Sequence, residues 1–244
     1  MKNYRSSNIS HYFYCPKAYK LSLEYQKEQS EAMREGLLFE GYVFGKFKED
    51  NEKELIGRKR PDTINLIKQK ADLVKPLFIK GEPFRKLLLK TSDYTISGEA
   101  DYVGTTLFQG KGIECIADLK FTGNMKVWDD LISLARKEDF IQAFIYPYLF
   151  YKETGKVLPF IYCVIENNFD NPLIKQIKFN TSIADFKWVS EMIETIHQDD
   201  FYYSNANYGT CVSGKYGRCS YLEHCNEGRN FIAGEIEMSL NNLS

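Results

Sequence analysis

Two charged side chains of opposite sign stand two residues apart at the end of a short apolar run, in Ile116-Ala117-Asp118-Leu119-Lys120. In an extended strand, residues i and i+2 point to the same face, so Asp118 and Lys120 are expected to project side by side. A carboxylate can bind a hard divalent cation, and a neighbouring ammonium can orient water or offset charge developing on a phosphate. The pair indicates nuclease-like chemistry, although Asp-x-Lys by itself occurs by chance in many chains.

A second carboxylate is predicted on the neighbouring strand. Asp101 lies in Gly98-Glu99-Ala100-Asp101, before a turn at 109–112, and Asp118 lies after that turn. A hairpin folded about Gly110-Lys111 brings Asp101 opposite the region of 118–120, and neighbouring strands lie about 5 Å apart, close enough for two carboxylates to share a cation. A slip of one residue would turn Asp101 to the wrong face, and the residues alone leave the register open.

Two helices offer further polar groups. Gln142 and Tyr146 are four residues apart in a predicted helix 139–152, hence on one face, and Pro147 is expected to kink or shorten that helix. Glu40 lies in a predicted helix 31–50. On the residues alone, a solvated polar edge explains these side chains equally well.

The remaining pattern predicts an α/β protein. Apolar periodicity and turn residues predict both helices and strands. The other expected helices span residues 17–26, 63–78, 124–136 and 182–197. The expected strands span residues 87–89, 94–96, 102–103, 105–108, 112–119, 159–166 and 173–179.

Composition is that of a soluble globular protein: 244 residues, 43% hydrophobic, 27% charged, with a net charge of -1. A nucleic-acid partner therefore requires a local basic groove. Candidates for its lining are basic side chains in three stretches, namely Lys17, Lys20, Arg58, Lys59, Arg60, Arg85, Lys86 and Lys90. No apolar run reaches the length of a membrane span and no signal-peptide core is visible, so we expect a cytoplasmic protein without membrane contact.

The cysteines are concentrated near the two ends of the chain. Cys211, Cys219 and Cys225 stand at x7 and x5 spacing in an irregular stretch, and thiolates so placed indicate a metal site. Cys15 is the natural fourth ligand, with His11 and His224 as competitors, whereas Cys115 and Cys163 fall in predicted strands. Paired C-x2-4-C zinc spacing is absent, so an iron-sulfur cluster is slightly favoured over Zn²⁺.

The order of these pieces resembles the RecB-like iron-sulfur branch of the PD-(D/E)XK nuclease superfamily, which includes CRISPR-associated adaptation exonucleases and the AddB nuclease domain. Cys15-Pro16 precedes the core motifs and three cysteines follow them, as in that branch. Two departures are visible: Glu40 replaces the usual His of a G-x-x-x-H motif, and the x7 cysteine gap replaces x2. The resemblance spans roughly residues 7 to 226.

The resemblance implies a restriction-endonuclease-like core, with a central mixed sheet flanked by helices and a four-cysteine metal cluster joining the N- and C-terminal segments. Residues 1–244 form one nuclease domain, with the core at 31–197 and cluster-binding flanks at 7–30 and 200–230. The cluster is a [4Fe-4S] cluster on four ligands, Cys15, Cys211, Cys219 and Cys225.

For the catalytic centre, the resemblance implies Mg²⁺ or Mn²⁺ on Asp101, Asp118, the Leu119 carbonyl and Glu40. Lys120 would place water and offset charge, and Gln142 and Tyr146 would orient the strand or Lys120. The expected function is metal-dependent exonucleolytic hydrolysis of DNA, on ends or single strands, in recombination, repair or CRISPR-type processing. Expected partners are DNA and a helicase, recombinase or CRISPR integrase protein. The alternative is a weakly catalytic or non-catalytic DNA-binding or adaptor protein.

Overall fold

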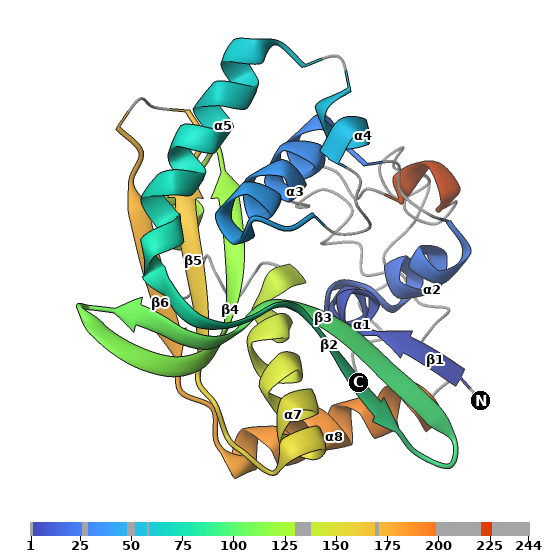
Figure 1. Cartoon of the computed structure of the whole chain (residues 1–244). Helices are drawn as coiled ribbons and strands as arrows, with labels where there is room; N and C mark the ends of the chain where they lie inside the picture. The colour runs from blue at the N-terminus through green and yellow to red at the C-terminus, as the bar shows by residue number, and fades with distance from the viewer. Residues whose placement is uncertain are drawn as a thin grey trace.

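The protein is an α/β structure in which helices cover both faces of a central sheet (Figure 1). The computed structural model describes residues 2–25, 29–47, 52–57, 59–129, 138–168, 171–198 and 221–225. None of the helices in these ranges combines the length and apolar character that crossing a membrane requires.

Six strands form one sheet within the described residues, with β1, β3, β4, β5 and β6 in that order and β2 also paired to β3. Parallel pairs (β1 with β3, β4 with β5) and antiparallel pairs (β2 with β3, β3 with β4, β5 with β6) make the sheet mixed, as expected. The strands are β1 (Lys2–Arg5), β2 (Phe78–Lys90), β3 (Tyr94–Phe108), β4 (Lys111–Thr122), β5 (Phe160–Glu166) and β6 (Ile174–Phe179).

The hairpin of β3 and β4 is set by a two-residue turn. Gln109 and Gly110 both have positive φ, 50° and 76°, the combination that a type I′ hairpin turn requires. The turn therefore pairs Phe108 with Lys111 and fixes the register along both strands. The turn is centred one residue earlier than the predicted Gly110-Lys111. In the observed register Asp101 therefore lies opposite Asp118, whereas the predicted turn would have placed it opposite Lys120.

One edge of β3 is shared by two strands. Because β2 pairs with β3 from Thr95 to Thr106, β1 and β4 must both occupy the opposite edge. There β1 pairs with residues 94–97 and β4 with residues 102–108. Residues 98–101 lie between these two ladders, and we call them the ladder gap.

The helices pack on the two faces of the sheet in separate apolar clusters. On one face lie α7 (Gln142–Thr154) and α8 (Ile183–Gln198); the other is covered by α3 (Glu31–Phe44) and α5 (Pro61–Val74) (Figure 1). The remaining helical elements are short: α1 (Ser6–Tyr14), α2 (Pro16–Glu24), α4 (Glu52–Ile56) and the 3-10 turns η2 (Lys75–Leu77), η3 (Met125–Trp128), η4 (Glu138–Ile141) and η6 (Leu222–His224).

Several predicted boundaries were wrong for identifiable reasons. Helix α3 ends at Phe44 because Gly45 adopts the left-handed conformation that closes a helix. Helix α7 continues through Pro147 to Thr154, with both neighbours of the proline buried against the sheet. In the described part of the predicted helix 124–136 the structure has the short η3, and residues 130–137 lie outside the described ranges.

Strand β3 is continuous from Tyr94 to Phe108, where the sequence had predicted separate strands at 94–96, 102–103 and 105–108. Gly104 pairs with Gly81 where β2 and β3 approach closely, and a Cβ on Gly104 would lie 2.3 Å from the carbonyl oxygen of Lys80. Glycine serves here to admit the neighbouring backbone and does not end the strand.

Candidate active site

Asp118 and Lys120 form an ion pair on β4. The Lys120 Nζ lies 2.6 Å from Oδ2 and 3.0 Å from Oδ1 of Asp118. The two residues point to the α7 face of the sheet, where Lys120 also lies 5.7 Å from the Tyr162 ring centroid. Asp118 is only 5% exposed, so this charged pair lies in a poorly solvated place.

Asp101 lies at the end of the ladder gap, where β3 and β4 separate. The β3–β4 ladder ends at Tyr102 paired with Ala117, and the same register places Asp101 across from Asp118. The Asp101 Oδ2 accepts a hydrogen bond of 2.9 Å from the backbone amide of Leu119, in place of a further ladder bond. The structure therefore brings the two carboxylates together, as the hairpin argument had predicted.

Tyr146 reaches the same place from α7. A Cβ added to Gly98 would lie 2.7 Å from the Tyr146 ring and 2.9 Å from the Ser6 hydroxyl oxygen, so the ring fills the ladder gap. Burial and the negative charges of Asp118 and Asp101 raise the pKa of Tyr146, which therefore keeps its proton at neutral pH. The phenol can thus donate a hydrogen bond toward an anion.

Gln142 begins α7, one turn before Tyr146, on the same side of the helix. Its Oε1 is buried and has no hydrogen-bond partner among the described residues. A buried acceptor of this kind suits a donor supplied from outside the chain. The structure therefore places Gln142 one helical turn from Tyr146, with a buried acceptor that no described residue uses.

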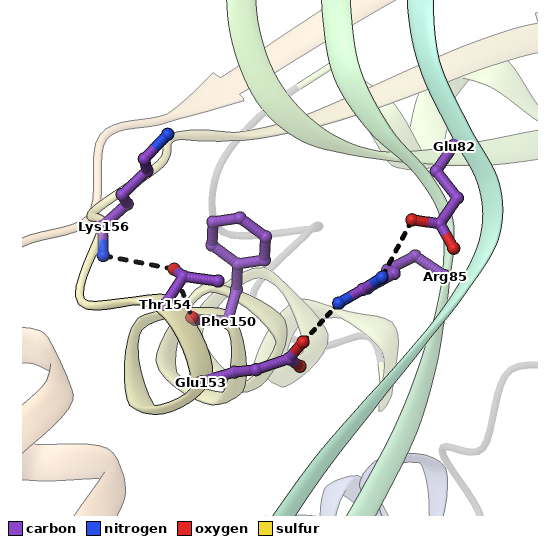
Figure 2. A network of polar contacts seen from close by, with 6 residues as sticks. All are labelled: Glu82, Arg85, Phe150, Glu153, Thr154 and Lys156. Carbon is purple, nitrogen blue, oxygen red and sulfur yellow. Dashed lines mark hydrogen bonds and ion pairs between the residues drawn. The ribbon is translucent and has the colours of Figure 1, made fainter.

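The far end of α7 is anchored to β2 by charge. Arg85 is bound by Glu153 on α7 and by Glu82, the latter at 2.9 Å, and Thr154 caps the helix through the carbonyl of Phe150 (Figure 2). These contacts fix the helix that carries Tyr146. They also give Arg85 a structural role in place of the predicted groove-lining one.

A second predicted groove residue is likewise paired. Lys59 contacts Glu31 at 2.6 Å and Glu35 at 3.3 Å, which ties it to the start of α3. Arg58 lies outside the described residues.

Glu40 lies on α3, and its Oε2 atom is buried. It follows Phe39, whose ring stacks on Phe121 at 4.8 Å. Because side chains alternate along a strand, Phe121 lies on the opposite face of β4 from Asp118 and Lys120. Among the described residues, no three His, Cys, Asp or Glu side chains form a group that could hold a metal ion.

The charges at the gap nevertheless fit a cation. Two buried carboxylates face each other, and Lys120 supplies one positive charge, so the group carries an excess negative charge in a poorly solvated place. Such an excess is costly unless a cation or a proton offsets it. Carboxylate oxygens are the ligands preferred by Mg²⁺ and Mn²⁺, so the donor set of Asp101 and Asp118 suits these ions.

A hollow of about 520 Å³ opens just beyond this pair, at the carboxyl ends of β4 and β5. Gly123, three residues after Lys120, forms part of its wall with Lys126, Lys175 and Asn168. Lys175 is bound to Asp129 at 3.2 Å, whereas Lys126 is exposed and makes no ion pair with any residue that the structure describes. A cation is therefore available in this hollow, at the end of the strand that carries Asp118 and Lys120.

The predicted cysteine site is described in part. Cys15 and Cys225 lie in one small buried cluster with Ala18, Leu21 and Tyr221, so residues near both ends of the chain meet beside α2 (Figure 1). Cys211 and Cys219 lie outside the described residues. The two competing histidines make aromatic contacts: His11 with Tyr221 at 5.7 Å and His224 stacked on Tyr25 at 3.9 Å.

The two remaining cysteines are core residues, as predicted. Cys115 and Cys163 are buried in the α3–α5 face of the sheet. Burial raises the pKa of Cys163 to about 12 and also raises that of Cys115, so both stay thiols at neutral pH. Neither has the thiolate character of a metal ligand.

Sequence reasoning missed Ser6. A serine ahead of a helix is typical of an N-cap, and its neighbours Ser7, Asn8 and Ser10 offered the same signal. The structure instead buries Ser6 in the gap beside Tyr146. The burial of Ser6 becomes apparent only from the pairing of β1 with β3, which lie some ninety residues apart in the chain. The four residues of β1 are too few for a periodic pattern to reveal the strand.

Comparison with known proteins identifies the fold. No family model and no curated protein sequence matches the chain. The crystal structure named "Putative exonuclease" from Eubacterium rectale aligns over 100% of this chain and 93% of its own, with a TM-score of 0.59 and 16% identity. The crystal structure of SSO0001 aligns over 93% and 87%, at 16% identity and a TM-score of 0.48. The chain therefore shares its fold, along its whole length, with the Eubacterium rectale protein.

Proposed function

We propose that the protein is a metal-dependent DNA exonuclease of the RecB-like PD-(D/E)XK type. The observation that carries this proposal is the convergence of Asp101, Asp118, Lys120 and Tyr146 at the ladder gap. The name of the Eubacterium rectale protein, whose fold the chain shares, supports an exonuclease in particular.

Each side chain has a role that its position supports. Asp101, Asp118, the carbonyl of Leu119 and Glu40 would hold Mg²⁺ or Mn²⁺. The ion would supply Lewis-acid activation of the phosphodiester and of the attacking water. Lys120 places that water and offsets negative charge growing on the phosphate. Tyr146 donates toward the same charge, and Gln142 orients the bound strand.

The direct test uses the full chain, freed of divalent ions by EDTA and then supplied with Mn²⁺, Mg²⁺ or Ca²⁺. Its substrates are single- and double-stranded DNA labelled at the 5′ or the 3′ end. We expect progressive shortening with Mn²⁺ and Mg²⁺ and no cleavage in EDTA, because carboxylates alone cannot activate water for this reaction. DNA binding without cleavage under every condition would instead support the adaptor alternative.

Lys126 is expected to contact a phosphate that follows the scissile one, because it lines the hollow beyond Lys120. Lys126→Ala should raise KM and leave kcat unchanged. Loss of one phosphate contact should reduce the slope of log affinity against log salt by about 0.7 for single strands or 0.9 for duplex DNA. Lys187→Ala is the control, since this exposed lysine lies on α8; equal slopes for the two variants would contradict the assignment.

A further inference from the structure

Ser6 occupies an unusual position for a residue at the start of a helix. It follows Arg5, which pairs with Ser97 as the last step of the β1–β3 ladder, and it begins α1. It is 3% exposed, and no side chain caps the amino end of α1. The Ser6 hydroxyl is therefore not used for helix capping.

The hydroxyl is directed into the ladder gap. A Cβ on Gly98 would meet the Ser6 oxygen at 2.9 Å and the Tyr146 ring at 2.7 Å, so both side chains lie against the same glycine. Ser6 makes a side-chain hydrogen bond to the Tyr146 hydroxyl. A serine hydroxyl can donate as well as accept, so Ser6 is able to donate to the phenol oxygen.

We propose that Ser6 is a positioning residue: its hydroxyl donates to the Tyr146 oxygen and thereby directs the Tyr146 proton toward the Asp101–Asp118 pair and the phosphate bound there. A phenol oxygen that accepts from Ser6 has its own proton left to donate elsewhere. The negative charges of Asp118 and Asp101 act on Tyr146. Ser6 thus acts on the reaction through Tyr146, and the inference rests on the proposed nuclease function.

A double-mutant cycle tests this coupling, with four proteins: wild type, Ser6→Ala, Tyr146→Phe and the double variant. We expect Ser6→Ala to lower kcat by about threefold to tenfold, the effect of one neutral hydrogen bond, with KM unchanged. In the Tyr146→Phe background the same change should have no effect, because the phenol oxygen is gone. If Ser6→Ala lowers kcat by the same factor in the Tyr146→Phe background as in the wild type, the proposal is overturned.

A second readout does not depend on catalysis. The same four proteins are unfolded in urea without divalent ions, and Ser6→Ala should cost less stability when Tyr146 is already phenylalanine. Additive costs would show that the hydrogen bond is absent. Ser7→Ala is the matched control, because Ser7 is exposed one residue along the same helix and should behave as wild type. If no protein cleaves DNA, the proposed function fails, while the urea cycle still decides whether Ser6 holds Tyr146.

Discussion

Replacement of Asp118 by asparagine is expected to lower kcat for DNA cleavage by about a thousandfold, the scale seen when a preorganised electrostatic group is removed from an active site. The amide has the shape of the carboxylate but loses the charge that binds the divalent ion and Lys120. Its cost in stability should be small, because removing one of two adjacent buried carboxylates also relieves their repulsion. Steady-state cleavage with Mn²⁺ and the midpoint of thermal unfolding measure both effects.

Glu114→Gln is the control for this experiment. Glu114 lies on the same strand, β4, and is exposed, so the substitution makes the same chemical change away from the ladder gap. We expect it to retain wild-type activity. Equal activity of Asp118→Asn and Glu114→Gln would contradict the assignment of the site, whatever the substrate.

The second large effect is expected at the cysteines. Cys15→Ser should abolish bound iron and the visible absorption of an iron-sulfur cluster, because the proposed four-thiolate site would lose the one ligand that comes from the N-terminal side. Metal binding by such a site contributes to the free energy of folding. A loss of about 3 kcal/mol or more would lower Tm by about 6 to 12 °C in a domain of this size.

Cys163→Ser is the matched control, since Cys163 is a buried thiol in β5 with the Gln176 side chain 3.7 Å from its sulfur. It should keep its iron. Unchanged iron content in Cys15→Ser would exclude Cys15 as a ligand. If the wild-type protein is colourless and contains zinc, and Cys15→Ser loses that zinc, the site on these residues is a Zn²⁺ site and not an iron-sulfur cluster.

The strands that carry the carboxylates could be predicted because their signals are local. A short apolar run marks β4, and the turn residues 109–112 precede it, which together give nearly the correct register. Tyr146 could be placed on a helix for the same reason, through its i, i+4 spacing from Gln142.

Features that depend on distant pairing could not be predicted. Strand β1 forms because it pairs with a stretch of the β3 edge that β4 leaves open. The four residues of β1 do not by themselves indicate this pairing. The lack of a side chain at Gly98 makes room for the Tyr146 ring, and nothing local in the sequence indicates that contact. Arg85 and Lys59 suggested a DNA surface, and the sequence does not show that glutamates on other elements pair with them.

The ladder gap also bears on the order in which the protein folds. The side chains around it come from residue 6, from β3 and β4, and from residue 146, so the gap closes only when three distant parts of the chain have met. Loop-closure entropy makes such long-range contacts slow to form, and local helices and the β3–β4 hairpin can form before them. The proposed nuclease activity should therefore be among the last properties that a newly made chain acquires.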